Sequence, residues 1–217
     1  MRYDLVIFDL DGTVLDTLSD LVDATNATLA ARGLPTHTRE EVRRMIGNGV
    51  TNQFRRAMPD GTPEAEREAA IAEYKAIYAK NLNVHTLPYP GMPELLRDLR
   101  GAGVRTAVNT NKMADAAQTL CAAHYDGLLD ALLGERAGMP KKPSPEGALR
   151  LMARFGVPPE RTLYVGDSDT DLMTAANAGI DGAWVSWGYR HRDELGGIEV
   201  SLAFDTVDAL RDYLFSE

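Results

Sequence analysis

The feature that most constrains this chain is a short apolar run near its start that ends in two closely spaced aspartates. Leu5–Phe8 supplies four consecutive apolar residues, a pattern typical of a strand buried on both faces of a parallel sheet. Asp9 and Asp11 follow at once, and because side chains alternate along a strand, the two carboxylates are expected on the same side. Gly12 then permits a turn. Ligands of open α/β sheets bind outside the carboxyl ends of the strands, so this turn is the first candidate for a functional site.

Composition narrows the class of protein. The chain has 217 residues, which suffice for one sizeable core with a smaller lobe or for two modest domains. A net charge of −9 disfavours nucleic acid and anionic membranes as partners. No signal-peptide pattern opens the chain, no apolar run approaches the ~20 residues of a membrane helix, and the single Cys121 cannot form an internal disulfide. We therefore expect a cytoplasmic protein without nucleic-acid or membrane partners, as a monomer or a homodimer.

The segment 17–85 has a helical pattern throughout. Apolar residues from Leu18 to Leu29 recur at the spacing of an amphipathic helix, and Thr38 with Glu41 forms a capping-box pattern that opens a second helix. Pro63 stands at the start of a long third helix. No strand pattern interrupts this block. The sequence therefore predicts an all-helical domain at 17–85, inserted into a main domain made of 1–16 and 86–217.

In the main domain, predicted strands alternate with predicted helices. The apolar runs indicate strands at 104–110, 129–133, 162–166 and 182–187, and helices at 94–102, 112–123, 145–155, 169–178 and 206–215. Such alternation is typical of parallel strands joined by right-handed crossovers. The predicted fold class is α/β, a Rossmann-like parallel sheet with helices on both faces, plus the small inserted helical domain.

Polar residues follow several predicted strands and should meet at one edge of the sheet. They are Asp9, Asp11, Thr110, Asn111, Lys112, Lys141, Lys142, Asp167 and Asp171. Together they suit a phosphoryl group. Carboxylates can hold Mg²⁺, while a hydroxyl such as that of Thr110, main-chain amides around Asp11 and Asn111, and a lysine can hold the phosphoryl oxygens. One carboxylate would act as nucleophile and another as acid and then base. Lys112 is interpreted instead as a solvated lysine in the first turn of a helix.

The pattern Asp-x-Asp-Gly-Thr-x-x-Asp at 9–16 resembles the signature of the haloacid dehalogenase superfamily of phosphotransferases. The resemblance covers essentially the whole chain and implies a phosphatase with a helical cap inserted after the first motif. It implies that Asp9 is the nucleophile and an Mg²⁺ ligand, and that Asp11 is the general acid/base whose carbonyl also reaches the metal. The other implied roles are phosphoryl binding by Thr110 and Lys142 and metal binding by Asp167 with Asp171.

Within that superfamily the chain is most similar to phosphoglycolate phosphatases. The similar stretches are Tyr89–Leu96, 110–112, 141–145 and 187–189, and in the helical domain Gly47-Asn48-Gly49 resembles the substrate-facing loop of that group. Gly147 departs from the pattern, since a further proline is common there. The resemblance implies a small phosphorylated metabolite as substrate, phosphoglycolate first, with Mg²⁺ as cofactor, and substrate contacts from Gly47, Asn48 and Gly49.

Two other functions stay open at this point. A phosphosugar mutase could use the same scaffold. A catalytically silent member that serves as a binding module is disfavoured, because Asp9, Asp11, Lys142 and Asp167 are all present.

Overall fold

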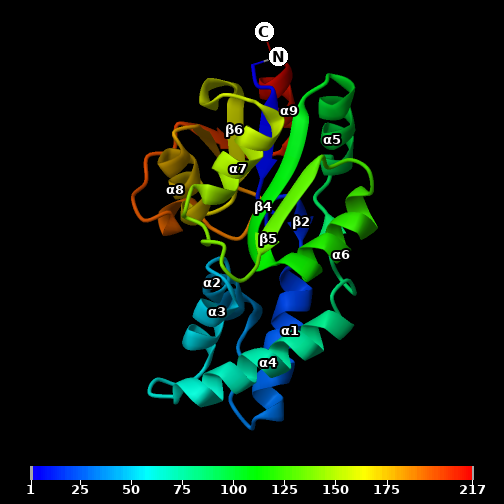
Figure 1. Cartoon of the computed structure of the whole chain (residues 1–217). Coiled ribbons are helices and arrows are strands. Elements are labelled where there is room, and N and C mark those ends of the chain that lie inside the picture. The colour runs from blue at the N-terminus through cyan, green and yellow to red at the C-terminus, as the bar shows by residue number, and fades with distance from the viewer. Residues whose placement is uncertain (1, 217) are drawn as a thin grey trace. The chain divides into compact units, whose positions relative to one another are not determined.

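The computed structural model describes residues 2–216, and Figure 1 shows its helices and strands. The chain forms two compact units: residues up to Asp16 together with those from Pro88 onward, and Thr17–Leu87. The first unit contains a large parallel sheet, and the second contains helices α1–α4. No helix among residues 2–216 combines the length and the apolar character that a bilayer span requires.

The sheet of the first unit has six strands in the order β5-β4-β1-β6-β7-β8, and every pair of neighbours is parallel. The strands are β1 (Leu5–Phe8), β4 (Arg105–Met113), β5 (Ala131–Glu135), β6 (Thr162–Gly166), β7 (Asp181–Val185) and β8 (Leu202–Phe204). All four residues of β1 are fully buried, which agrees with a central strand covered on both faces. This order places the carboxyl end of β1 between those of β4 and β6.

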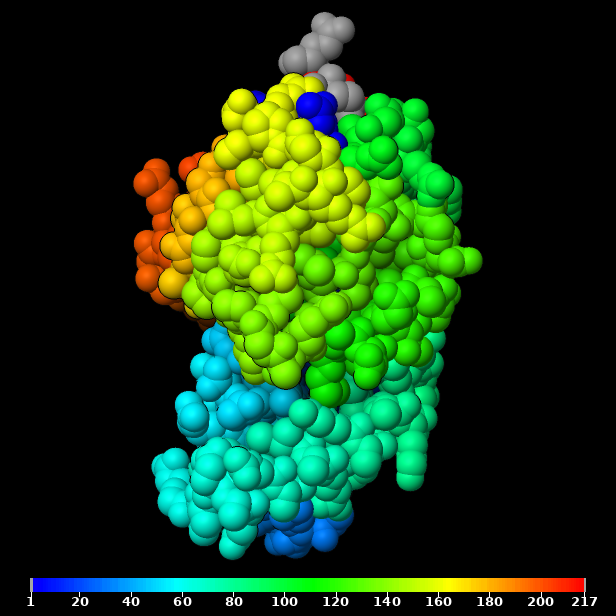
Figure 2. Space-filling model, viewed as in Figure 1, coloured from blue at the N-terminus to red at the C-terminus, as the bar shows by residue number. Residues whose placement is uncertain are grey.

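Helices cover both faces of this sheet, as expected for right-handed crossovers between parallel strands. They are α5 (Met92–Gly101), α6 (Ala114–Tyr125), α7 (Glu146–Phe155), α8 (Asp169–Ala178) and α9 (Val207–Phe215), with 3₁₀ turns at Pro159–Arg161 and Arg192–Glu194. Helices α7 and α8 pack together on one face, whereas α5 packs with α9. In Figure 2, α7 and its flanking loops form the central part of the surface of this unit that faces the viewer. The predicted α/β fold class is confirmed.

The second unit contains α1 (Leu18–Ala31), α2 (Arg39–Met45), α3 (Val50–Ala57) and α4 (Glu64–Lys80). The predicted capping box is present at the start of α2, where the Thr38 hydroxyl and Glu41 bond reciprocally. Two short strands outside the large sheet, β2 (Leu15–Asp16) and β3 (Leu87–Pro88), pair with each other.

The helical unit ends two residues later than the boundary expected from the sequence, at Leu87 instead of residue 85. Asp20 on α1 gives the physical reason. Its buried carboxylate accepts hydrogen bonds from the main-chain N–H groups of His85 and Thr86 and from the Thr86 hydroxyl. These contacts fix residues 85 and 86 to α1, so they belong to the helical unit.

Candidate active site

The turn after β1 brings the first aspartate against the end of β6. The main-chain N–H of Asp9 donates to the Val165 carbonyl at 2.9 Å, and the Asp9 side chain is buried. Gly12 has φ +84°, and a Cβ at this position would lie 2.6 Å from Oδ2 of Asp167. Glycine is required for both reasons, since other residues disfavour this conformation and would collide with the carboxylate. The predicted turn is therefore present, and it packs closely on Asp167.

Lys142 lies in the loop between β5 and α7, and its buried amine sits between two carboxylates. Its Nζ is 2.8 Å from Oδ1 of Asp9 and 2.6 Å from Oδ1 of Asp171. Burial alone would lower the pKa of Lys142, but the carboxylates of Asp171 and Asp9 raise that pKa well above its usual value. The lysine therefore provides a fixed positive charge beside Asp9.

Three carboxylates converge around this lysine. Asp9, Asp167 and Asp171 each offer an oxygen, and these atoms lie within 4.8 Å of one another. Burial and the neighbouring carboxylates, opposed by Lys142, raise the pKa of Asp9 to about 6 and that of Asp167 to about 8. No described group gives Oδ1 of Asp9 a hydrogen bond of good geometry, although the Lys142 amine is close. Three carboxylates that lie this close repel one another, and such an all-oxygen cluster fits a divalent cation such as Mg²⁺.

Asp167 and Asp171 have different surroundings. Asp167 accepts one hydrogen bond on each oxygen, from the Thr13 hydroxyl at 3.2 Å and from the Tyr189 N–H at 2.6 Å. Asp171 uses Oδ1 for Lys142 and Oδ2 for both the N–H and the hydroxyl of Ser168 at the start of α8. Asp171 is therefore tied more completely to the protein than Asp167, and it orients the lysine.

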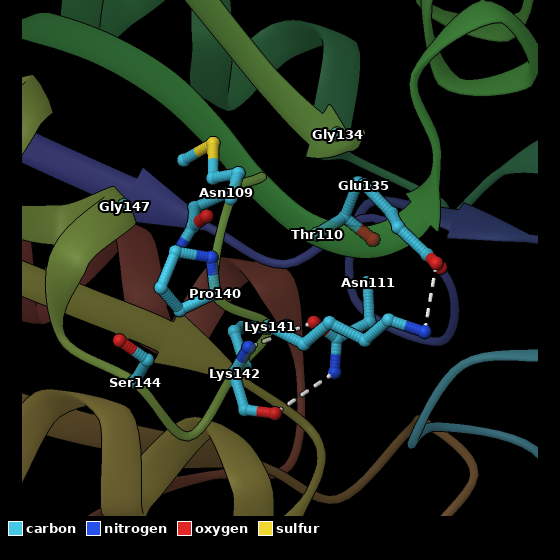
Figure 3. A pocket seen from close by; sticks show the side chains of 11 residues that line it. Asn109, Thr110, Asn111, Gly134, Glu135, Pro140, Lys141, Lys142, Ser144 and Gly147 are labelled. Atoms are coloured by element: carbon cyan, nitrogen blue, oxygen red, sulfur yellow. Dashed lines mark hydrogen bonds and ion pairs between the residues drawn. The ribbon is translucent and has the colours of Figure 1, made fainter. Parts of the chain in front are cut away.

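Thr110 and Asn111 lie at the end of β4, and both are buried. The Thr110 hydroxyl accepts from the N–H of Lys112 at 3.2 Å, which fixes its orientation. The Asn111 carboxamide binds the main chain of Lys142 twice: it accepts from the N–H at 2.8 Å and donates to the carbonyl at 3.2 Å (Figure 3). The side chain of Asn111 therefore holds the lysine loop, and phosphate binding at residue 111 stays a prediction.

A small cavity of about 10 Å³ lies behind this edge, with room for about one water molecule. Lys141 closes one side through an ion pair of 2.7 Å with Glu135, and Asn109 and Gly147 line another side (Figure 3). A Cβ at residue 147 would lie 2.3 Å from Oδ1 of Asn109. This contact explains why residue 147 of this chain is a glycine.

The prediction of a solvated Lys112 is wrong. The residue is 8% exposed, and its Nζ lies 2.8 Å from Oδ1 of Asp11. It is buried because β4 continues to Met113, three residues past the predicted end, so Lys112 belongs to a strand and not to the first turn of α6. A hydrophobic pattern could not reveal this extension, since residues 109–112 are all polar.

The predicted substrate-binding loop belongs to the helical unit, between α2 and α3. Gly47 and Gly49 have φ values of +111° and +79°, and the Asn52 amide donates to the carbonyl of Asn48 at 3.0 Å. The loop therefore needs its glycines for conformation. Substrate binding by Gly47, Asn48 and Gly49 stays a prediction.

Comparisons with known proteins agree with this fold and site. A family model described as haloacid dehalogenase-like hydrolase matches residues 6–185. The chain is 36% identical to "Phosphoglycolate phosphatase 1" of Pseudomonas aeruginosa, over 97% of this chain and 78% of that protein. A crystal structure of a phosphoglycolate phosphatase candidate from Lactobacillus delbrueckii subsp. bulgaricus has a TM-score of 0.93 at 30% identity and covers both chains completely. CbbY of Rhodobacter sphaeroides, solved with xylulose-(1,5)bisphosphate, has a TM-score of 0.75 at 26% identity over 94% of each chain.

These findings confirm the resemblance to the haloacid dehalogenase superfamily and to phosphoglycolate phosphatases. They support the prediction of a phosphoric monoester hydrolase. The family match extends from β1 to the end of β7 and so includes every carboxylate and lysine of the site described above. The chain belongs to the haloacid dehalogenase-like hydrolase family.

Proposed function

We propose that this protein is a Mg²⁺-dependent phosphomonoesterase that works through an aspartyl-phosphate on Asp9. The observation that carries the proposal is the environment of the Asp9 carboxylate. Its carboxylate is buried, paired with the fixed charge of Lys142, and adjacent to the carboxylates of Asp167 and Asp171. A buried carboxylate that lies beside one lysine and two further carboxylates is poised for a cation and an electrophile more than for a structural role.

The proposed reaction has two steps. In the first, an oxygen of Asp9 forms a bond to phosphorus while the bond to the leaving oxygen breaks and the carboxylic acid of Asp11 donates a proton to that oxygen. In the second, water attacks phosphorus, Asp11 accepts a proton from the water, and the bond between phosphorus and Asp9 breaks. Lys142 and Thr110 hold the phosphoryl oxygens in both steps, because charge on these oxygens must be neutralised and fixed in place.

In this proposal the carboxylates of Asp9 and Asp167 and the main-chain carbonyl of Asp11 would hold the metal. Asp171 would support it indirectly, since its own oxygens already bind Lys142 and Ser168. A bound Mg²⁺ would neutralise charge on the phosphoryl oxygens and lower the repulsion between phosphate and carboxylates.

The proposed substrate is a small phosphorylated metabolite, phosphoglycolate first. The relative from Pseudomonas aeruginosa carries that activity in its name, and CbbY was solved with a phosphorylated sugar. We further propose that 17–85 forms a cap over the core made of 1–16 and 86–217, with substrate contacts from Gly47, Asn48 and Gly49. Glycines in that loop allow close approach of the main chain to a small anion.

Trapping the phosphorylated enzyme tests the chemistry. The variant Asp11→Asn, given p-nitrophenyl phosphate and Mg²⁺, should gain the mass of one phosphoryl group, because formation of the intermediate persists with a good leaving group while its hydrolysis slows by about 10²–10⁴-fold. The variant Asp9→Asn should gain no such mass and lose turnover. An adduct on Asp9→Asn, or full turnover by that variant, would show that another residue is the nucleophile.

A substrate panel tests the specificity. Values of kcat/KM for phosphoglycolate, glycerol phosphate, sugar phosphates and nucleotides should rank phosphoglycolate first. The variant Asn48→Ala should lower kcat/KM for phosphoglycolate by about 1–3 kcal/mol and affect p-nitrophenyl phosphate much less. Equal losses on both substrates would remove this loop from the specificity site.

A further inference from the structure

A second buried lysine of the α/β unit contacts the second aspartate of the motif. Lys112 Nζ donates to Oδ1 of Asp11 at 2.8 Å, and only 4% of its side-chain surface is exposed. Lys142 contacts Asp9 and Asp171 instead. Lys112 and Lys142 therefore contact different carboxylates. Burying an ammonium group is unfavourable unless it is paired with an opposite charge. The ion pair with Asp11 offsets the desolvation of Lys112.

The local structure of β4 fixes Lys112 in this place. The register between β4 and β5 shifts between Asn109 and Met113, and β4 resumes pairing there with Glu135. The main-chain N–H of Lys112 donates to the Thr110 hydroxyl within that irregular stretch. The same stretch of β4 thus positions Thr110, which we propose as a phosphoryl ligand, and the lysine that reaches Asp11.

Asp11 needs such a contact more than Asp9 does. The Asp11 side chain is 22% exposed, whereas that of Asp9 is 12% exposed and bound by Lys142. A partly exposed carboxylate on a short side chain can rotate away from the bond that it must protonate, and general acid catalysis requires the acid within hydrogen-bond reach of the leaving oxygen. A buried ammonium group at 2.8 Å restricts that rotation.

We propose that Lys112 is a positioning residue that holds the Asp11 carboxyl group in place for proton transfer to the leaving group. This inference rests on the proposed function, because it assigns Asp11 the role of general acid. Lys112 acts through Asp11 and contacts neither phosphorus nor the metal in this account.

The dependence on the leaving group distinguishes positioning from a merely structural role. An alkyl phosphate expels a poor leaving group that requires protonation, whereas p-nitrophenol leaves readily as its anion. Loss of a positioned acid should therefore slow the alkyl substrate selectively. A general loss of folded protein would slow both substrates equally.

The test compares kcat/KM for glycerol phosphate and for p-nitrophenyl phosphate in the full-length protein with Mg²⁺. The ratio of the two values is independent of the fraction of folded enzyme, and kcat/KM reports the first phosphoryl transfer. Lys112→Met, which keeps length and removes charge, should lower this ratio by about tenfold or more, as expected for partial loss of general acid catalysis. Lys112→Arg, which keeps a cation, should restore most of the ratio. Lys141→Met is the matched control at the same edge of the sheet and should leave the ratio unchanged.

A double variant completes the test. If Lys112 acts only through Asp11, adding Lys112→Met to Asp11→Asn should lower the ratio no further than Asp11→Asn alone. An unchanged ratio in Lys112→Met, or a further independent loss in the double variant, would overturn this inference while leaving an Asp9-dependent phosphatase intact. Full turnover by Asp9→Asn would overturn the proposed function and this inference together.

Discussion

Replacing Lys142 by methionine should destabilise the metal-free protein strongly. The amine lies 2.8 Å from Asp9 and 2.6 Å from Asp171, and its side chain is 3% exposed. Removing one partner of a buried ion pair costs about 3–5 kcal/mol, because the remaining charge is left without compensation. For a chain of this size 1 kcal/mol corresponds to about 2–4 °C, so Tm should fall by about 6–20 °C.

The lower half of that range is expected at pH 7. Burial and the carboxylates of Asp171 and Asp9 raise the pKa of Asp167 to about 8, so Asp167 is largely protonated without metal and part of the repulsion is relieved. The assay is differential scanning calorimetry of Lys142→Met and the parent in the presence of a chelator. Lys141→Met is the control, because its ion pair with Glu135 is partly exposed and such pairs contribute only about 0–1 kcal/mol.

Mg²⁺ extends the same experiment. A ligand that binds the folded state at 100 times its Kd adds about 2.7 kcal/mol of stability, and Lys142→Met should gain more than the parent because its carboxylates lack the ammonium group. A Tm within 2 °C of the parent in chelator would refute the electrostatic reasoning for Lys142. A Tm unaffected by Mg²⁺ in both proteins would refute the metal site.

Three further outcomes follow from particular contacts. The pKa values of Asp9 and Asp167 are raised to about 6 and about 8, so the stability that these groups contribute is present below their unfolded pKa values near 4 and is lost as pH rises through 6 and 8. Because protons compete with the metal for these carboxylates, the affinity for Mg²⁺ measured by calorimetry should rise over the same interval. An affinity independent of pH would contradict this. Asp20→Ala should lower the free energy of unfolding by about 3–5 kcal/mol in a denaturant titration, since it leaves the N–H groups of His85 and Thr86 without their carboxylate; a change under 1 kcal/mol would show that water replaces it. Gly147→Ala should cost about 1–3 kcal/mol through its collision with Asn109, whereas alanine without effect would show that the Asn109 side chain moves aside.

Local patterns sufficed for much of the α/β fold and for the position of its candidate site. The strands β1 and β6 were predictable because buried parallel strands are short apolar runs, and both agree with their predicted bounds. Asp9 and Asp167 follow these two strands, which are neighbours in the sheet, so their convergence follows from topology alone. Edge strand β8 was missed, because Leu202–Phe204 is short and only partly buried, and its strand conformation depends on pairing with β7.

The sequence could not separate residues that bind from residues that orient, because that difference depends on which atoms are already used. Asp167 and Asp171 are both acidic and one helical turn apart, yet both oxygens of Asp171 already accept hydrogen bonds from Lys142 and Ser168. Lys112 lies on β4 and Lys142 follows the neighbouring strand β5, yet Lys112 contacts Asp11 and Lys142 contacts Asp9. The position at which β4 ends determines whether Lys112 is buried. Because the strand continues past Thr110, it buries a lysine that a helix at the same position would expose to solvent. Such an extension depends on pairing with Glu135 across a shifted register, which is a property of two strands and not of either sequence alone.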